Sequence, residues 1–292
     1  MTVQSKQLVK LLRLRHYIKN FFLFLPLFFS GRLREWVSLR ACCLGFIAFC
    51  FTSSAVYIFN DIRDAESDRR HSTKSLRPIA SGAVPARYAW ATAAVMLLLS
   101  VSAQGLAGRN SRASWVYLAV YLTLNIAYSW RLKQVPILDV SILAAGFLLR
   151  LAYGAALSGV AVSGWLFLTV LAMSFYLGLG KRRGELLKQK DTRQVLKTYS
   201  REFLDKSMNM CLTLTIAFYS LWAAEGSNLP DGNSSYTGGL LWTVPLAMAI
   251  CFKYSLDVEG DSDGDPVEVA LRDKPLCGLV LLLALMIFAL LY

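Results

Sequence analysis

Residues 57–70, YIFNDIRDAESDRR, contain an asparagine and three aspartates at short intervals, whose side-chain oxygens can bind a metal ion: Asn60, Asp61, Asp64 and Asp68. On a helix, at 100° per residue, the three aspartates fall within about 60° of one another, whereas Glu66 points to another face. Carboxylates this close repel each other unless a cation lies between them. Proteins usually bind Mg²⁺ through one or two carboxylates together with phosphates of the substrate. The spacing predicts a magnesium site on Asp61, Asp64 and Asp68 for a phosphorylated ligand; the alternative is a solvated helix end.

Two cations follow in residues 71–82, HSTKSLRPIASG, namely Lys74 and Arg77. An arginine can bind a phosphate through two parallel N–H groups, and a lysine acts as a point charge. We expect both side chains to bind the anion that the metal holds. The alternative is that they belong to the ordinary positive charge of a cytoplasmic loop.

Long apolar segments must position these residues. The chain has 292 residues, of which 55% are hydrophobic and 17% charged, against about 25% charged in soluble domains. A membrane-spanning helix needs about 20 mostly apolar residues, and backbone in lipid must satisfy its own hydrogen bonds. Nine runs are plausible spans, and the first of them is short and would enter at an angle: residues near 18–31, 41–59, 88–107, 114–130, 136–157, 164–180, 207–225, 239–256 and 275–292. We therefore expect one all-α polytopic membrane domain over residues 1–292, with nine transmembrane helices.

The basic residues are distributed unevenly. The net charge is +12, but with a cytoplasmic N-terminus 25 of the 31 lysines and arginines fall in inside segments. This bias orients membrane proteins. It places the polar loops near 60–87, 181–206 and 253–274 in the cytoplasm, predicts a multi-pass protein of the inner (cytoplasmic) membrane, and argues against nucleic acid as a partner. The six cysteines show no C-x-x-C spacing, so we expect small buried hydrophobes instead of disulfides or a zinc site.

Two motifs carry a family resemblance. The pattern N-D-x-x-D-x-x-x-D followed by K-x-x-R-P-I-A-S-G, and the segment Tyr128–Lys133 (Y-S-x-x-L-K), resemble the UbiA-type membrane prenyltransferase superfamily. The resemblance implies a UbiA-like bundle of nine helices with a cytoplasm-facing, laterally open cavity. It also implies that Mg²⁺ holds a substrate diphosphate between two acidic motifs.

Other segments favour one branch of that superfamily. Residues 254–274 carry Y-x-x-D and then G-x-P-x-E-x-x-L-x-D, which resemble the decaprenyl-phosphate phosphoribosyltransferase branch. Residues 12–20 resemble its R-P-R-x-x-x-K-N motif, with Leu14 where proline is usual, and residues 55–57 and 180–186 resemble its A-V-Y and G-K-R-x-x-E-L elements. Asp257 and Asp261 have the D-x-x-x-D spacing of members with aromatic acceptors, but the closing G-x-K-S-like element is missing.

The resemblance, together with the negative charge of the ligands, implies a substrate-binding set. Its members come from five segments of the chain: Lys19, Asn20, Tyr57, Asn60, Lys74, Arg77, Lys181, Arg182, Tyr199, Asp257, Glu268 and Asp273. The loop 181–206 has nine basic residues, with apolar residues at helical spacing, so it is either an amphipathic helix at the membrane surface or a charged loop. Arg150 lies inside an apolar run, and we expect it to join an ion pair or, alternatively, to contact a lipid phosphate.

The expected activity is that of a pentosyltransferase. The enzyme would transfer 5-phosphoribose from phosphoribosyl pyrophosphate to a polyprenyl (decaprenyl-type) phosphate, with Mg²⁺ as cofactor. The product, polyprenyl-phosphoryl 5-phosphoribose, would be a precursor for cell-envelope arabinan or a related glycolipid. One alternative is a prenyltransferase moving an isoprenoid from its diphosphate to an aromatic or other small acceptor; another is a transporter with an acidic cytoplasmic gate. Membrane lipids are expected partners, and small residues such as Gly178 and Gly180 permit a homo-oligomer without demanding one.

Overall fold

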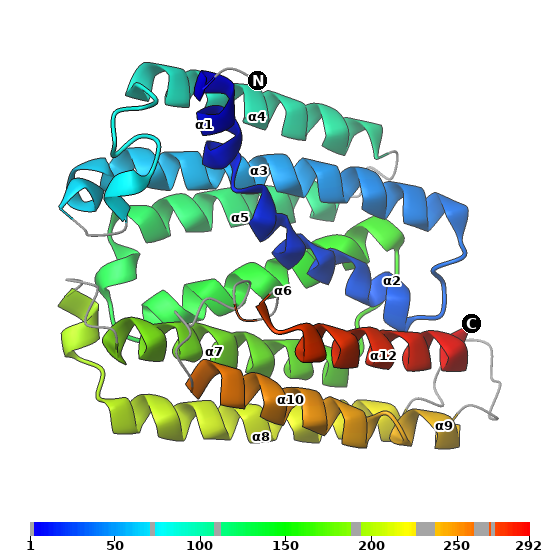
Figure 1. The fold of residues 1–292 in the computed structure, drawn as a ribbon. Coiled ribbons are helices and arrows are strands. Elements are labelled where there is room, and N and C mark those ends of the chain that lie inside the picture. Colours follow the sequence, from blue (N-terminus) through cyan, green and yellow to red (C-terminus); the bar gives the residue numbers. More distant parts are fainter. Residues whose placement is uncertain are drawn as a thin grey trace. The chain divides into compact units, whose positions relative to one another are not determined.

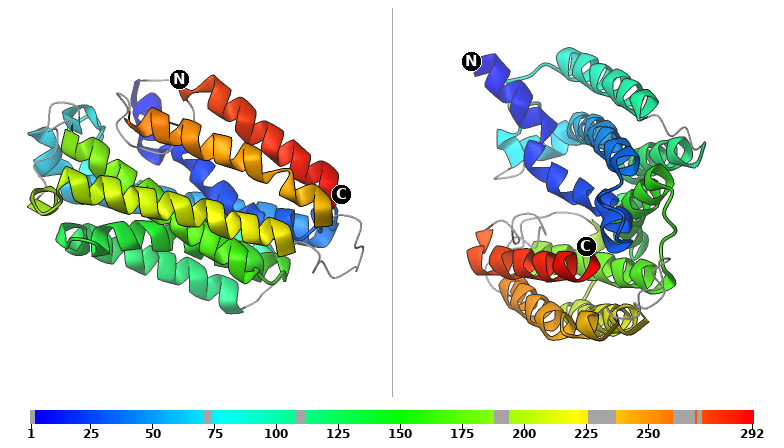
Figure 2. Two further views of the ribbon diagram at one scale, coloured as in Figure 1. Left: turned by 90° about the horizontal axis from the view of Figure 1, so that it is seen from below. Right: turned by 90° about the vertical axis from the view of Figure 1, so that its right-hand side faces the viewer.

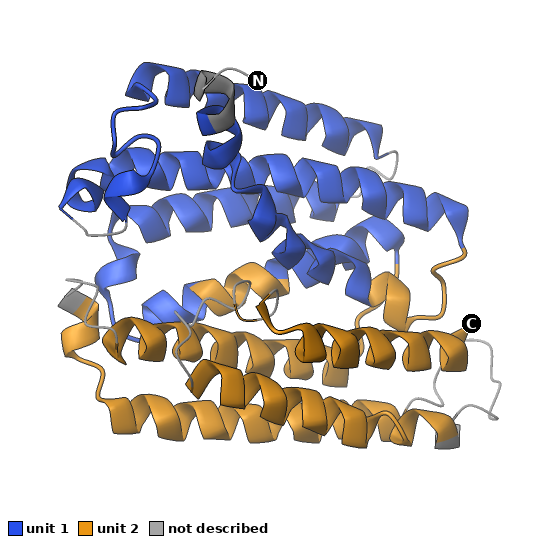
Figure 3. Ribbon diagram, viewed as in Figure 1, with its two compact units in different colours: residues 1–25, 35–142, 149–159 blue, residues 26–34, 143–148, 160–292 orange. Residues whose placement is uncertain are grey.

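The computed structural model describes residues 3–70, 74–107, 112–187, 194–225, 237–259, 269 and 272–292. All regular elements in these ranges are helices (Figure 1). The all-α expectation is therefore confirmed for this part of the chain. The chain divides into two compact units, which are coloured separately in Figure 3. Unit 1 comprises residues 1–25, 35–142 and 149–159, and unit 2 comprises residues 26–34, 143–148 and 160–292. That the chain forms one domain stays a prediction.

Unit 1 is built around one long helix, α3 (Trp36–Arg69). Helices α4 (Ala86–Leu106) and α5 (Arg112–Trp130) pack along α3 (Figure 1). The N-terminal helix α1 (Val3–Leu12) and the 3₁₀ helix η1 (Leu14–Phe24) also contact it. Close approach to α4 is possible because the facing side chains are small: Thr52 and Ser100 share a hydrogen bond of 2.7 Å between hydroxyls.

Helix α3 is longer than a membrane is thick. Its 34 residues extend for about 51 Å at 1.5 Å per residue, whereas the hydrocarbon core of a bilayer is about 30 Å thick. A crossing that begins near Trp36 leaves about 14 residues beyond the hydrocarbon. These residues contain the aspartates of the first acidic motif, so one continuous helix can both cross the membrane and carry charged groups outside it.

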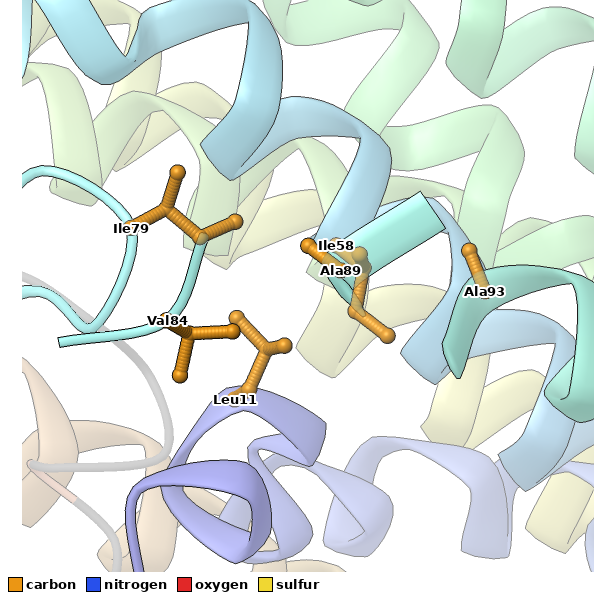
Figure 4. Packing of buried hydrophobic residues seen from close by; sticks show 6 residues of the cluster. All are labelled: Leu11, Ile58, Ile79, Val84, Ala89 and Ala93. Carbon is orange, nitrogen blue, oxygen red and sulfur yellow. The ribbon is translucent and has the colours of Figure 1, made fainter. Parts of the chain in front are cut away.

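A hydrophobic cluster fixes α1 beside the end of α3. Leu11 of α1, Ile58 of α3 and Ala89 of α4 are fully buried in it (Figure 4). Ile79 and Val84, from the connection between α3 and α4, complete the cluster. Burying an aliphatic side chain of this size is favourable by about 1.5–3 kcal/mol. The cluster therefore anchors both the connection that carries Lys74 and Arg77 and the helix that leads into η1.

Two short 3₁₀ elements and one helix complete unit 1. They are η2 (Lys74–Leu76), η3 (Leu132–Gln134) and α6 (Leu138–Ser158). Residues 143–148 of α6 belong to unit 2. Gly159 follows the last residue of α6 and adopts the left-handed conformation (φ 69°) common at helix C-termini.

Unit 2 is a set of long helices that lie side by side. Helix α7 (Gly164–Leu187) packs along α8 (Arg201–Glu225), and α10 (Val244–Glu259) contacts both α8 and α12 (Lys274–Leu291), as Figure 2 shows. The short elements are α2 (Leu25–Phe29), η4 (Gln194–Lys197) and α9 (Thr237–Leu241). Asp273 begins α12 by accepting a hydrogen bond of 2.7 Å from the backbone N–H of Leu276, the usual role of aspartate at a helix N-terminus.

Seven helical spans among the described residues are long and apolar enough to cross a membrane. They are Trp36–Arg69, Ala86–Leu106, Leu138–Ser158, Gly164–Leu187, Arg201–Glu225, Gly239–Glu259 and Lys274–Leu291. The sequence predicted nine. The run near 114–130 is helical as α5, and the run near 18–31 lies in η1 and α2, but neither is among the seven.

Candidate active site

The first acidic motif lies at the C-terminal end of α3 and forms an ion network with cations from elsewhere in unit 1. Asp61 is only 2% exposed. Its Oδ1 atom lies 2.5 Å from Nη2 of Arg13 and 3.2 Å from Nη1 of Arg77. The same Nη1 of Arg77 lies 2.7 Å from Oδ2 of Asp68. One guanidinium thus joins two buried carboxylates that stand two helical turns apart.

The third aspartate has a cation of its own. Asp64 Oδ1 lies 2.5 Å from Nζ of Lys133, which belongs to η3. Arg13 follows α1, Arg77 follows η2 and Lys133 follows α5, so three separate segments each bring one cation to the acidic face of α3. The face is therefore neutralised within unit 1 by groups that could also bind phosphate oxygens.

Arg13 stands at a bend in the chain. Its backbone adopts the left-handed conformation (φ 53°, ψ 48°) between α1 and η1, which is costly for a residue with a side chain. Its guanidinium lies 5.1 Å from the centre of the Tyr57 ring, and the His16 ring lies 5.4 Å from the same ring. Backbone strain of this kind is common at functional sites, and here it accompanies the contact with Asp61.

Other predicted residues of unit 1 lie in different environments. Asn60 accepts a hydrogen bond from Ser129 of α5. Lys74 and Lys19 are partly exposed, on η2 and η1 respectively. Asn20, in contrast, is fully buried, and its amide contacts Cys50, Ser53 and Arg150. The side chain of Asn20 therefore serves contacts inside the protein, while its neighbour Lys19 has access to the outside.

The donors at this face suit Mg²⁺ bound together with a phosphorylated ligand. Carboxylate and amide oxygens are the hard ligands that this ion prefers. Within the described ranges, however, no three histidine, cysteine, aspartate or glutamate side chains form a group that could hold a metal ion. The residues therefore fit an ion that takes one or two carboxylates and completes its shell with phosphate oxygens, as Mg²⁺ does, and not one held by protein ligands alone.

The predicted cations of unit 2 lie near the end of α7. Arg182 is fully buried, and its Nη1 lies 2.5 Å from Oε2 of Glu185. Lys181 is partly exposed. Tyr199 is buried and stacks on Phe203, with ring centres 5.9 Å apart. In the described part of the loop 181–206, α7 continues to Leu187 and α8 begins at Arg201, so this part is not a single amphipathic helix.

The second acidic motif is held together by one lysine. Nζ of Lys253 lies 2.5 Å from Oδ1 of Asp257, and it also bonds to Oδ2 of Asp273. Hydrogen bonds from Lys253 and from the backbone N–H of Leu276 hold the pKa of Asp273 below its ordinary value. Asp273 therefore stays ionised at neutral pH, where it can accept both bonds. Glu268, also predicted to bind substrate, lies outside the described residues.

Three cations of these networks were not singled out as site residues from the sequence: Arg13, Lys133 and Lys253. Arg13 and Lys133 stand at the first and last positions of motifs that were recognised, R-x-R-x-x-x-K-N and Y-S-x-x-L-K. Their position in a motif was the available signal. Lys253 directly precedes the Y-x-x-D pattern, and at four residues before Asp257 it has the helical spacing of an ion pair.

The helices and the two acidic motifs are typical of one class of protein. The model of the UbiA prenyltransferase family matches residues 22–257, and the chain belongs to this family. It is an integral membrane transferase. The solved structure of a UbiA homologue from Archaeoglobus fulgidus bound to GPP and Mg²⁺ has a similar fold, with a TM-score of 0.73 at 20% identity over 98% of this chain and 99% of that one.

Among curated relatives, the chain is similar to members of one branch of the family. The decaprenyl-phosphate phosphoribosyltransferase of Corynebacterium glutamicum is 34% identical over 238 residues, which cover 80% of this chain and 70% of that protein. The decaprenyl-phosphate phosphoribosyltransferase of Mycolicibacterium smegmatis is 31% identical over 281 residues, which cover 92% and 87% of the two chains. The resemblance to this branch that the motifs indicated is therefore confirmed.

Proposed function

We propose that this protein transfers 5-phosphoribose from phosphoribosyl pyrophosphate to a polyprenyl phosphate of the decaprenyl type and releases pyrophosphate. The names of the curated relatives support this reaction. The observation that carries it to this chain is the ion network of α3, in which Asp61, Asp64 and Asp68 are each paired with a cation from another segment. Such a face offers carboxylates that can bind a metal ion and cations that can bind phosphate oxygens, and a pyrophosphate leaving group requires both.

In this proposal one or two carboxylates of the set Asp61, Asp64 and Asp68 would hold Mg²⁺, and phosphate oxygens of the donor would complete its shell. When bound, the ion supplies positive charge that stabilises the departing pyrophosphate. Arg13, Arg77 and Lys133 then bind pyrophosphate oxygens in place of the carboxylates that they contact in this structure. Because these cations sit on three different segments, they can contact different oxygens of the leaving group, which fixes its position relative to the ribose.

The bond changes need no catalytic base. The bond between C1 of the ribose and the pyrophosphate oxygen breaks, and its electron pair leaves with pyrophosphate. A phosphate oxygen of the acceptor forms the new bond to C1. That oxygen is already ionised at neutral pH, so no proton has to be removed. His16 and His71 are the two histidines of the chain, and no role as a base is assigned to either.

The remaining predicted contacts belong to the same proposal. Tyr57 and Lys19 would bind the 5-phosphate of the donor, and Asn60 and Lys74 would contact the diphosphate. Lys181, Arg182, Tyr199, Asp257, Glu268 and Asp273 are assigned to substrate binding from the resemblance alone. We further propose nine membrane crossings, a laterally open cavity facing the cytoplasm, and a location in the inner membrane. A role in cell-envelope arabinan or a related glycolipid follows from the proposed product.

The test compares two labelled donors in membranes that contain the protein. Phosphoribosyl pyrophosphate with polyprenyl phosphate should give a labelled lipid that depends on Mg²⁺ and disappears with chelator. A prenyl diphosphate with an aromatic acceptor should give none. The reverse pattern would support the alternative prenyltransferase reaction and overturn the proposal.

A further inference from the structure

A buried arginine lies deep within a predicted membrane span of unit 1. Arg150 is 5% exposed and stands twelve residues after the first residue of α6, about 18 Å along the helix axis. A charged side chain at such a depth costs about 2.5–3.5 kcal/mol on membrane-insertion scales, and residues of this kind are usually functional. The contacts of Arg150 show which segments of the protein it holds together.

The guanidinium of Arg150 binds the N-terminal 3₁₀ helix. Its Nε donates a hydrogen bond of 2.9 Å to Oδ1 of Asn20 in η1, and its Nη2 donates one of 3.0 Å to the hydroxyl of Tyr121 in α5. Its Cζ lies 4.9 Å from the ring centres of both Phe49 and Tyr121. Hydrogen bonds from a charged donor are stronger than those between neutral groups, so Arg150 ties Asn20 firmly to α6.

A second contact lies one turn further along α6. A Cβ atom added at Gly154 would lie 1.8 Å from the backbone oxygen of Leu23, so the backbone of η1 crosses α6 at this glycine. Helix α6 therefore holds η1 at two points, Arg150 on Asn20 and Gly154 on Leu23. Asn20 and Leu23 stand three residues apart in η1. Tyr17 stands three residues before Asn20, and its hydroxyl lies 2.7 Å from that of Ser54 in α3.

The spacing of three matches the winding of η1. It has 11 residues in 3₁₀ conformation, whereas 3₁₀ runs longer than three or four residues are uncommon. At three residues per turn, Tyr17, Asn20 and Leu23 share the inward stripe, and His16 and Lys19 share the neighbouring one. In an α-helix, Lys19 would lie about 60° away from His16 around the axis. The winding that buries Asn20 thus also sets the direction of Lys19.

We propose that Arg150 is a positioning residue that holds η1 in its 3₁₀ winding through Asn20, and thereby directs Lys19 towards a phosphate group of the donor. The role of Lys19 rests on the proposed function, whereas the hold on η1 rests on the contacts of Arg150 alone. Arg150 itself touches no substrate in this account.

The experiment uses Arg150→Gln and Arg150→Lys in the full-length protein, with Tyr153→Phe as the matched control. Tyr153 is buried on the same helix and donates a hydrogen bond to Gln104 of α4, so its loss removes a buried polar contact that does not involve η1. Deuterium uptake of the peptide covering residues 14–24, the melting temperature, and KM and kcat for phosphoribosyl pyrophosphate are measured for each variant.

Arg150→Gln should speed deuterium uptake in residues 14–24 and raise KM for the donor at least about tenfold, as expected for one lost charge-assisted hydrogen bond, with a smaller change in kcat. Arg150→Lys, which keeps the charge, should recover part of both effects. Tyr153→Phe should lower the melting temperature without either effect. Unchanged uptake in Arg150→Gln would overturn the proposal, and so would faster uptake with a KM like that of Tyr153→Phe.

The two proposals fail in different ways. If the unaltered protein transfers no phosphoribose, the proposed function is overturned. Deuterium uptake needs no turnover, so it still decides whether Arg150 holds η1. If Arg150→Gln does not fold, Arg150→Lys tests the proposal instead. Deuterium uptake and KM equal to those of the unaltered protein would then show that η1 does not depend on the guanidinium, and would overturn the proposal.

Discussion

Asp61 and Asp68 share the guanidinium of Arg77 in a largely buried ion network. Removing one partner of such a network leaves a buried charge without its counter-ion, which lowers the free energy of unfolding by about 3–5 kcal/mol. In the proposed reaction a bound pyrophosphate would change this balance, since it would bring negative charge for the arginines while a metal ion would bring positive charge for the aspartates. The proposed donor, which would arrive with its own cation, therefore suits the charges of this network.

Replacing Asp61 by Asn tests the role of the carboxylates. The amide has nearly the same shape but cannot carry the charge that a metal ion needs, so transfer should fall by at least about 10²-fold, and Asp64→Asn should behave alike. Glu66→Gln is the matched control, since Glu66 lies on the same helix, is 81% exposed and pairs with the exposed Arg70. Membrane yield and initial rates are measured; normal turnover by Asp61→Asn would contradict the assignment.

Lys133 offers a separate test of the phosphate contacts. Lys133→Gln removes the cation beside Asp64 and should raise KM for phosphoribosyl pyrophosphate about tenfold, the equivalent of one charged hydrogen bond. Steady-state kinetics with varied donor measures this. Arg70→Gln, which removes an exposed cation near the same end of α3, should leave KM unchanged. Equal effects of the two substitutions would indicate a general loss of positive charge.

The carboxylates of the candidate site and Arg77 were predictable from sequence, but the partners Arg13 and Lys133 were not. Asp61, Asp64 and Asp68 lie on one helix, where spacing alone determines the shared face. Arg13 is 48 residues from Asp61 and Lys133 is 69 residues from Asp64, so their pairing depends on how α1 and α5 pack against α3. Tertiary contacts over such distances leave no periodic pattern in the sequence.

At the scale of elements, the N-terminal segment differs most from expectation. An apolar run near 18–31 indicated a membrane span, and the structure has η1 followed by the short α2. In this run Leu23 and Leu27 are fully buried in the protein, so its hydrophobicity serves packing against other helices as well as the proposed crossing. The 3₁₀ winding depends on contacts with α3 and α6, which local propensity does not encode. The helices of the other apolar runs follow the prediction more closely.

The crossing of η1 and α6 predicts a large effect for one methyl group. Gly154→Ala places a carbon 1.8 Å from the Leu23 oxygen, so the two backbones must separate, at a cost of about 1–3 kcal/mol for overpacking. Gly105→Ala in α4 is the control, because nothing lies within 4 Å of the added carbon. Melting temperatures in detergent should show a clear decrease for Gly154→Ala and none for Gly105→Ala; equal values would contradict the crossing.

At the scale of the whole molecule, the charge distribution and the long α3 support the proposed orientation, with the acidic end of α3 in the cytoplasm. The predicted cytoplasmic segments hold most of the basic residues, and the acidic end of α3 extends past the apolar part of the helix. The sequence predicts this arrangement because charge bias and hydrophobic length both follow from the positions of residues along the chain. The substrates of the proposed reaction, phosphoribosyl pyrophosphate above all, are water-soluble or have a polar headgroup, so one aqueous side must supply them.

The two ends of α3 provide a test of orientation. Single cysteines are introduced as Arg34→Cys, just before the helix, and Glu66→Cys, near its acidic end, both at exposed positions, with exposed Cys43 and Cys277 replaced by serine. A membrane-impermeant maleimide should label Arg34→Cys in intact cells and Glu66→Cys only after permeabilisation. Labelling of Glu66→Cys in intact cells would place the acidic motif outside and contradict the proposed orientation.

The most direct measurement of the central claim is the mass of the lipid product. Membranes containing the protein are incubated with Mg²⁺, phosphoribosyl pyrophosphate and a mixture of polyprenyl phosphates, alongside membranes containing Asp61→Asn. We predict a new lipid heavier than an added polyprenyl phosphate by one phosphoribosyl group, formed only by the unaltered protein. If the unaltered protein forms no such lipid, or if Asp61→Asn forms as much, then the acidic face of α3 is not the site of phosphoribosyl transfer.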